Sequence, residues 1–351
     1  MRTTFKPEDV TVLLKDITGL VEPLPTSERE RRIQSGTHYC EMLPIEYKPT
    51  PPYLEAYETA LRAYAGETAA AVARVAEMIY HEKKEVPVLV SLARAGTPVG
   101  VLIRHYLKRT YGIDAPHYTI SIIRGRGIDH NAMKYLLKLY EPQRLQFVDG
   151  WIGKGAILNV LREALSDYPG VSEQLAVLAD PAHVTSLCGT HEDILIPSSC
   201  LNSTVSGLMS RTFLRGDIIG SEDFHGAVYY GELKGEDMTY AFIDAIEKEF
   251  ETLRLTPDSS TPSTQTGMDE IRGIARSFDI TDINLIKPGI GETTRVLLRR
   301  VPWKVLIRQD SQEDPVLRHI YRLAEEKQVE LVPWPLKNYR ACGIIKKCSD
   351  I

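Results

Sequence analysis

A glycine-rich loop behind a predicted buried strand carries the clearest chemical signal in the sequence. In the stretch FVDGWIGKGAI, residues 147–157, apolar side chains lead into Asp149. The loop behind it combines small residues with one lysine: Gly150, Gly153, Lys154, Gly155 and Ala156. Glycines let a backbone approach a ligand closely, and the free N–H groups at a helix start bind anions. We therefore expect Asp149 to accept hydrogen bonds from sugar hydroxyls and the loop to hold a phosphate.

Two other loop types share this composition. A Walker A loop requires GxxxxGK[ST], which this stretch does not match, because Gly155 follows Lys154. A tight strand-to-helix turn with a helix-capping acid needs no ligand. That alternative stays open, since a glycine-rich loop alone is a weak signal.

Two further loops place phosphate-binding residue types behind other predicted strands. The first, in VSLARAGTPVG, consists of Ala93, Arg94, Ala95, Gly96 and Thr97. The second, in SIIRGRGIDHN, contains Arg124 and Arg126, whose guanidinium forks suit phosphate oxygens. Ligands bind beyond the carboxyl ends of parallel strands, so we expect these loops to lie near Asp149. For Arg126 taken alone, a solvated surface loop remains the alternative.

A third set of reactive residue types surrounds Cys200 in IPSSCLNSTVSGLMSRT. Pro197 and the serines suit a helix start, and we expect residues 200–211 to continue as a helix. A thiol at a helix start has a lowered pKa, which favours Cys200 as a nucleophile. His225 in DFHGAVYY is the candidate base. The candidates for orienting that base are Asp193, Asp217 and Asp223.

The region around Cys200 also has two non-catalytic interpretations. A buried free cysteine usually acts as a small hydrophobic residue. Hydroxyl groups at a helix start can instead hold a substrate phosphate, and the candidates are Ser198, Ser199, Ser203 and Thr204. We expect Cys188, in SLCGTHED, and Asp180, after LAVLA, to line the same face of the sheet.

Alternating strand and helix patterns must position these loops. Apolar, β-rich runs at 86–92, 117–123, 145–148 and 175–179 are separated by amphipathic stretches at 99–112, 133–140 and 156–168. This alternation predicts an α/β fold with a mainly parallel sheet and helices on both faces. Residues 53–83 have helical periodicity that is broken at Gly66, which predicts two helices.

The chain divides into two predicted domains. Residues 1–254 form the larger one, of which 1–52 are an N-terminal extension with a short helix in PTSERERRIQSG. The Ser/Thr/Pro-rich stretch 255–268 is a linker. Residues 269–351 form a small α/β domain in which KPGIGETT, residues 287–294, is expected to be a turn.

Composition narrows the cellular setting and the partners. The formal net charge is −5, but residues 269–351 hold 15 Lys/Arg against 12 Asp/Glu, a net of +3 that suits an anionic partner. The five cysteines include no CxxC pair, which favours a reducing cytoplasm and no protein metal site. We find no secretory signal and no membrane-spanning stretch.

The strand–loop pairs together resemble the phosphoribosyltransferase fold. The resemblance implies that Ala93–Thr97 bind pyrophosphate and that Asp149–Ala156 bind the ribose 5-phosphate of phosphoribosyl diphosphate or a nucleotide-like molecule. It also implies Mg²⁺ carried by that diphosphate, and a mobile loop at Arg124 and Arg126 that covers the site. Where that family usually carries a second acid, this sequence has Gly150.

Longer motifs resemble a narrower family. IQSGTHYCEMLPIEY, SLARAGTPVGVLIRHYL, IPSSCLNSTVSGLMSRT and DFHGAVYY are similar to StiP proteins of bacterial tellurium-resistance stress clusters, which are often labelled cysteine proteases. KPGIGETTRVLLRRVPWKVLIR is similar to their pelota-like RNA-binding domain. The expected RNA contacts are Arg295, Arg299, Arg300 and Arg340. Three functions stay open: phosphoribosyl transfer, cysteine hydrolysis, and non-catalytic nucleotide and RNA binding.

Overall fold

The larger domain is built on a six-stranded parallel sheet. The computed structural model of the chain describes residues 1–46, 48–256, 266–311 and 314–347. The sheet has strand order β1-β6-β5-β9-β10-β11, and all its neighbouring strands are parallel. The strands are β1 Thr11–Val12, β5 Val88–Leu92, β6 His117–Ile120, β9 Leu145–Trp151, β10 Leu175–Ala179 and β11 Cys188–Thr190.

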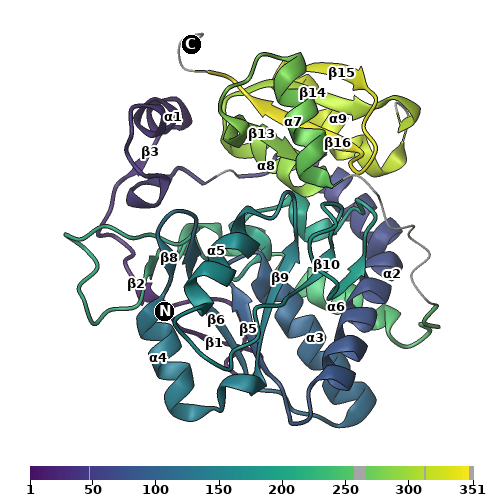
Figure 1. Cartoon of the computed structure of the whole chain (residues 1–351). Coiled ribbons are helices and arrows are strands. Elements are labelled where there is room, and N and C mark those ends of the chain that lie inside the picture. The colour runs from purple at the N-terminus through teal and green to yellow at the C-terminus, as the bar shows by residue number, and fades with distance from the viewer. Residues whose placement is uncertain (47, 257–265, 312–313, 348–351) are drawn as a thin grey trace.

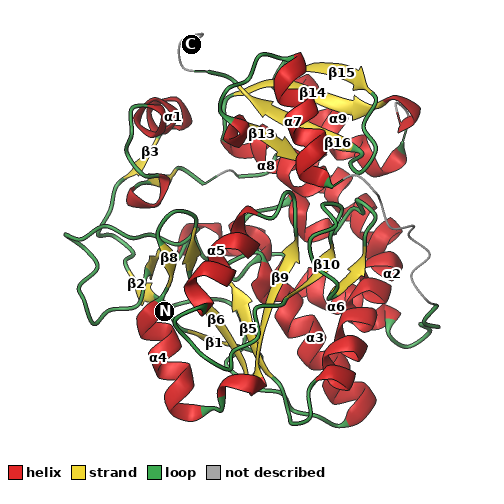
Figure 2. Ribbon diagram, viewed as in Figure 1, coloured by secondary structure: helices red, strands yellow, loops and turns green. Residues whose placement is uncertain are grey.

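Helices cover both faces of this sheet (Figures 1 and 2). One face packs against α2 Pro51–Glu82, α3 Gly96–Tyr111 and α6 Thr239–Glu249. The other packs against α4 His130–Leu139 and α5 Ala156–Leu165. Strands β5 and β10 are wholly buried, as expected for apolar runs covered on two faces. The predicted α/β fold with a mainly parallel sheet is confirmed.

Helix α2 is one continuous helix, so the predicted break at Gly66 is wrong. A glycine inside a helix costs about 1 kcal/mol relative to alanine. Burial of Ala65 and Ala69 on either side of Gly66 outweighs that cost, because both belong to the apolar core that α2 shares with the sheet.

The N-terminal extension runs outside the main sheet and carries the predicted short helix, α1 Thr26–Gln34. Three small two-stranded pairs brace this region and the loops near it. They are β2 Lys15–Asp16 with β12 Gly226–Ala227, β3 Pro23–Leu24 with β4 Leu43–Pro44, and β7 Ile122–Ile123 with β8 Gly127–Ile128.

The C-terminal domain is a separate small α/β unit. Its sheet has the order β13-β16-β14-β15. The strands are β13 Ile286–Pro288, β14 Pro302–Arg308, β15 Glu330–Trp334 and β16 Ala341–Ile345, and the helices are α7 Gly267–Ser277, α8 Ile290–Arg299 and α9 Arg318–Glu326. The stretch 287–294 is therefore not a turn, since it completes β13 and begins α8.

The two domains share a continuous apolar core. Ile290, Leu297 and Ile320 of the C-terminal domain belong to the same buried cluster as the residues of α2 and α3. Helix α8 also packs against the turn η3, Pro197–Cys200. This places the C-terminal domain over the carboxyl edge of the main sheet (Figure 1). Among the described residues, no helix is long and apolar enough to cross a membrane.

Strand order explains where a ligand can enter. After β5 the chain adds β6 on one side, whereas β9, β10 and β11 lie on the other side. In open α/β sheets ligands bind at such a reversal, beyond the carboxyl ends of the strands. The loops after β5 and β9 therefore flank the expected site.

Candidate functional site

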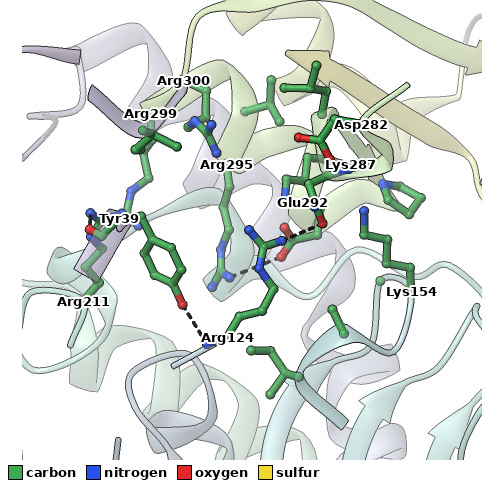
Figure 3. Close-up of a pocket in the computed structure, with 18 of the residues that line it drawn as sticks. Tyr39, Arg124, Lys154, Arg211, Asp282, Lys287, Glu292, Arg295, Arg299 and Arg300 are labelled. Atoms are coloured by element: carbon green, nitrogen blue, oxygen red, sulfur yellow. Dashed lines mark hydrogen bonds and ion pairs between the residues drawn. The ribbon is translucent and has the colours of Figure 1, made fainter. Parts of the chain in front are cut away.

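A large cavity lies between the carboxyl edge of the sheet, the N-terminal extension and the C-terminal domain (Figure 3). Its volume is about 990 Å³. Four acidic side chains line it, Glu30, Asp149, Asp282 and Glu292. Ten basic ones line it as well: Arg29, Arg31, Arg124, Lys154, Arg211, Lys287, Arg295, Arg299, Arg300 and Lys347. The formal excess of six positive charges makes this cavity a binding place for an anion.

The loop after β9 reaches the cavity as the sequence predicts. Asp149 and the loop Gly153–Ala156 all line it. Gly155 has a φ of +84° immediately before α5, a conformation that favours glycine. Asp149 Oδ1 accepts a hydrogen bond of 2.8 Å from the Gly150 N–H, and burial raises the pKa of Asp149 to about 6. At neutral pH the carboxyl group is thus mostly ionised and can accept hydrogen bonds from hydroxyls.

Lys154 both lines the cavity and ties the two domains together. Its ammonium donates hydrogen bonds to the carbonyl oxygens of Ile283 at 2.6 Å and Ile286 at 3.1 Å. Burial lowers its pKa to about 8, and the charge of Arg124 adds to this effect. The predicted phosphate-binding lysine therefore also fixes β13 over the loop.

Lys287 of β13, in the C-terminal domain, lines the same cavity (Figure 3). Burial lowers its pKa to about 7; Glu292 opposes this shift, and the charges of Lys154 and Arg124 reinforce it. A lysine held partly neutral by burial, with its cationic neighbours adding to the effect, gains a proton when an anion arrives.

Several arginines of the cavity have buried donor groups without a partner. Among the described residues, the Nε–H groups of Arg29, Arg211, Arg295 and Arg299 are buried and form no hydrogen bond. Burial lowers the pKa of Arg29 to about 9, and the charges of Arg211 and Arg299 lower it further. An unmade buried hydrogen bond costs about 1–3 kcal/mol, so four such donors in one cavity indicate a missing acceptor.

Aromatic rings hold some of these cations in place. The Arg295 guanidinium lies 4.5 Å from the centre of the Trp151 ring and pairs with Glu292 at 3.4 Å. The guanidinium groups of Arg124 and Arg211 lie 5.9 Å and 5.2 Å from the centre of the Tyr39 ring, and the Tyr39 hydroxyl accepts a hydrogen bond of 2.9 Å from the backbone N–H of Arg124 (Figure 3).

The loop after β5 contributes less than predicted. Of this loop only Ala95 lines the cavity. Arg94 is buried, donates to the Met209 carbonyl at 2.7 Å and pairs with Glu46 at 3.7 Å, so its pyrophosphate contact stays a prediction. Gly96 serves close packing, because a Cβ there would lie 2.5 Å from the Val148 carbonyl oxygen. Thr97 is buried and bonds Thr119 at 2.9 Å.

The two arginines of the loop 124–126 lie in different places, one at the cavity and one outside it. Arg124 lines the cavity and donates to Asn284 Oδ1 at 3.0 Å, which links the loop to the C-terminal domain. Arg126 does not line it and pairs with Glu41 at 2.8 Å. The surface interpretation therefore fits Arg126.

The predicted helix at Cys200 does not form. Two short 3₁₀ turns, Pro197–Cys200 and Ser203–Val205, take its place. The hydroxyl candidates are all buried and none lines the cavity, so their phosphate role stays a prediction: Ser198, Ser199, Ser203 and Thr204. Cys200 is wholly buried, and burial raises its pKa to about 12 instead of lowering it.

Cys200 and His225 do not form a pair. The His225 ring bonds Ser121 Oγ at 2.8 Å, and its backbone N–H donates to Asp129 at 2.6 Å. None of the three predicted orienting acids bonds this ring in the described structure. Asp217 pairs with Arg215, Asp223 with Lys15, and Asp193 accepts backbone hydrogen bonds from Ile290 and Arg340.

The arginines predicted to form an RNA-binding face are divided between two places. Arg295, Arg299 and Arg300 line the cavity, where Arg299 pairs with Glu46 at 3.3 Å and Arg300 with Glu30 at 2.7 Å. Arg340 lies outside the cavity lining and pairs with Asp314 at 3.1 Å. The four expected RNA contacts are therefore split between the cavity and another part of the domain, and RNA binding by them stays a prediction.

Sequence reasoning missed several cavity residues. Lys287 lies in the stretch that was expected to be a turn, and Arg29 lies in the short helix expected in PTSERERRIQSG. Arg211 and Tyr39 lie in two of the StiP-like motifs, IPSSCLNSTVSGLMSRT and IQSGTHYCEMLPIEY, but neither residue was expected to contact a ligand. Only the density of basic residues in SERERR and in TTRVLLRR pointed to this part of the molecule.

Comparisons with known proteins fit this two-domain arrangement. The family described as "Tellurite-like stress resistance cysteine protease StiP" matches residues 3–247, and the family described as "PELOTA RNA binding domain" matches residues 265–347. A protein of Acinetobacter baylyi (strain ATCC 33305 / BD413 / ADP1), named "Cysteine protease StiP", is 37% identical over 365 residues. The match covers 98% of this chain and 94% of that protein.

Proposed function

This chain belongs to the StiP family, and from its cavity we propose that it binds a ribose-phosphate compound and transfers a phosphoribosyl group. The observation that carries the proposal is the set of four unpartnered guanidinium N–H groups in a cavity with six excess positive charges. A small molecule with several phosphate groups would offset this positive charge and accept hydrogen bonds from the guanidinium groups that line the cavity.

Each wall of the cavity has a distinct role in this proposal. The N–H groups of Gly153–Ala156 and Lys154 hold the 5-phosphate, because they stand at the start of α5. Asp149 accepts hydrogen bonds from the ribose hydroxyls. Arg124 and Arg295, which both line the cavity (Figure 3), bind the diphosphate.

The chemistry replaces one bond at the ribose C1 by another. The C1–O bond to diphosphate breaks, an acceptor nitrogen or oxygen forms a bond to C1, and the acceptor's proton leaves to solvent. The ribose becomes positively charged in the transition state, and the Asp149 carboxylate can stabilise that charge. Mg²⁺ would arrive bound to the diphosphate oxygens, and the carboxylate of Asp149 could supply one further oxygen ligand. The metal would neutralise the negative charge of the leaving diphosphate.

RNA is proposed as a partner of the C-terminal domain. Because Arg295, Arg299 and Arg300 line the cavity, RNA phosphates can reach them only at its mouth. This placement favours an RNA end or a single-stranded segment over the side of a duplex.

Cysteine hydrolysis is the second candidate, and the name of the Acinetobacter relative favours it. Neither Cys40 nor Cys200 suits a nucleophile, since both are wholly buried and burial raises their pKa values to about 11 and 12. Burial likewise raises the pKa of Cys342. This candidate therefore depends on a different thiol.

The transferase proposal is tested by pyrophosphate release. The full chain is mixed with phosphoribosyl diphosphate, Mg²⁺ and a mixture of nucleobases, and released pyrophosphate is measured. We expect release by the native chain and at least a hundredfold less by Asp149→Asn. Asp217→Asn is the matched control, because Asp217 pairs with Arg215 away from the cavity. Release that is absent, or equal in native chain and Asp149→Asn, would reject transfer.

A further inference from the structure

We propose that Cys188, His191 and Asp180 form a nucleophilic thiol site that acts on acyl groups, such as peptide or ester carbonyls. The site deepens the cysteine-hydrolase candidate and does not depend on phosphoribosyl transfer. None of the three residues lines the large cavity. From the sequence we expected Cys188 and Asp180 to line the same face of the sheet, but we assigned no catalytic partner to either residue.

The sheet edge brings the three residues together. Cys188 begins β11, the edge strand, and is in register with Val177 of β10. Asp180 directly follows β10, and His191 directly follows β11. Strand β11 is held tightly, because a Cβ at Gly189 would lie 2.6 Å from the Ala71 carbonyl oxygen of α2.

Hydrogen bonding fixes the protonation pattern of His191. Its Nδ1 lies 3.0 Å from the carbonyl oxygen of Asp180, which can only accept, so Nδ1 carries the proton. In that tautomer Nε2 is the acceptor, and it lies 3.6 Å from Cys188 Sγ, while Nδ1 lies 3.8 Å from the same sulfur. Contacts of this length in a ligand-free site commonly shorten when substrate binds.

Asp180 supplies the third element of the arrangement. Its Oδ2 lies 3.6 Å from His191 Nδ1 and accepts the N–H groups of Val184 at 2.7 Å and Thr185 at 2.8 Å. Its Oδ1 is buried and forms no hydrogen bond within the described residues. A fixed, under-neutralised carboxylate beside the ring stabilises the imidazolium that forms when the thiol gives up its proton.

Cys188 is also the most accessible of the described cysteines. It is 8% exposed, whereas Cys40, Cys200 and Cys342 are each 0% exposed. The His191 side chain is 25% exposed and stacks on His183 with ring centres 4.4 Å apart. An extended peptide can bind along the edge strand of a sheet through main-chain hydrogen bonds. A sulfur on such a strand therefore suits a peptide substrate better than a small molecule that needs a deep pocket.

The reaction follows from these positions. His191 Nε2 takes the proton of Cys188, and Sγ forms a bond to the acyl carbon. The C–N or C–O bond of the substrate breaks, and the leaving group takes the proton from His191. Water then hydrolyses the thioester, which releases a carboxylic acid and restores the thiol.

The test measures the reactivity of each cysteine in the full chain. Iodoacetamide is added at pH 7, and labelling of each cysteine is followed by peptide mass spectrometry, with the guanidinium-unfolded chain as reference. We expect Cys188 to label at least tenfold faster than in the unfolded chain, while Cys200 labels more slowly. His191→Gln should slow Cys188 about tenfold, and His225→Gln, whose ring contacts Ser121, should leave it unchanged.

A second measurement addresses the substrate class. p-Nitrophenyl acetate serves as the acyl probe, and we expect Cys188→Ser to abolish its hydrolysis while Cys200→Ser retains it. The site is overturned if Cys188 of the native chain labels no faster than Cys188 of the unfolded chain. This comparison needs no variant. If Cys188 labels fast but ester hydrolysis does not depend on it, the proposed acyl chemistry is overturned. The labelling and hydrolysis results are both independent of pyrophosphate release.

Discussion

Glu30 of α1 and Arg300, the residue after α8, form an ion pair of 2.7 Å that joins the N-terminal extension to the C-terminal domain beside the cavity. The Arg300 guanidinium donates twice to the carboxylate of Glu30, which is only 1% exposed. The two residues are 270 positions apart, so the wall that they complete exists only in the folded chain.

Breaking this pair should loosen the C-terminal domain. Hydrogen bonds to charged groups contribute about 1.5–3 kcal/mol, so Glu30→Gln should lower the free energy of unfolding by about 2 kcal/mol. Urea unfolding of the native chain and of Glu30→Gln measures this difference in the free energy of unfolding. Glu28→Gln on the same helix is the control, because Glu28 bonds the exposed Arg31 and Arg32 and its loss should change little. Equal effects of both variants would contradict the role given to Glu30.

Gly291→Ala should push the two domains apart. A Cβ at this position would lie 2.4 Å from the Trp151 ring, so either the ring or helix α8 must shift. We expect two separate melting transitions by calorimetry, and a larger radius of gyration by X-ray scattering. Gly273→Ala in α7 is the control, since nothing lies within 4 Å of a Cβ there. A single unchanged transition for Gly291→Ala would show that the docking tolerates the methyl group.

Anion binding should take up a proton at pH 8. Lys287, whose pKa burial lowers to about 7, is mostly neutral at that pH, and a bound phosphate raises its pKa. Affinity should therefore fall as the pH rises from 7 to 9. Calorimetry with phosphoribosyl diphosphate in two buffers of different ionisation enthalpy measures the uptake.

Lys287→Met should remove this proton uptake. Lys304→Met, a change at a lysine that pairs with Glu330 outside the cavity, should retain it. Uptake that persists in Lys287→Met would assign the proton to another group.

RNA and the small ligand should compete. If RNA phosphates enter the cavity mouth, phosphoribosyl diphosphate should displace a labelled RNA oligonucleotide from the full chain at low salt. Arg295→Gln should also flatten the salt dependence by about one unit in a log–log plot, one per lost phosphate contact. Simultaneous binding of both ligands would place RNA on another surface.

Local sequence patterns predicted the sheet and one wall of the cavity. Asp149 and Gly153–Ala156 stand where a buried strand meets a glycine loop, so a short window suffices to find them. The opposite walls were not predictable in this way. Arg29, Arg211 and Lys287 meet through long-range packing, and nothing in their own segments indicates a shared cavity.

Cys200 shows why a local motif can mislead. The hydroxyl-rich stretch has the composition of a helix start, but Asn202 adopts φ −117° and ψ −110°, and Leu208 has a φ of +55°. Tertiary contacts, including the hydrogen bond from Tyr53 to the Cys200 carbonyl at 2.7 Å, hold the chain in short turns. Burial then raises the pKa of the thiol that a helix dipole would have lowered.

The most direct test of the cavity's role is isothermal titration of the full chain with phosphoribosyl diphosphate and Mg²⁺. The account predicts binding of one molecule per chain by the native protein. It predicts affinity at least tenfold weaker in both Asp149→Asn and Arg295→Gln, and unchanged affinity in Asp217→Asn. No binding by the native chain, or equal affinity in all four proteins, would contradict it.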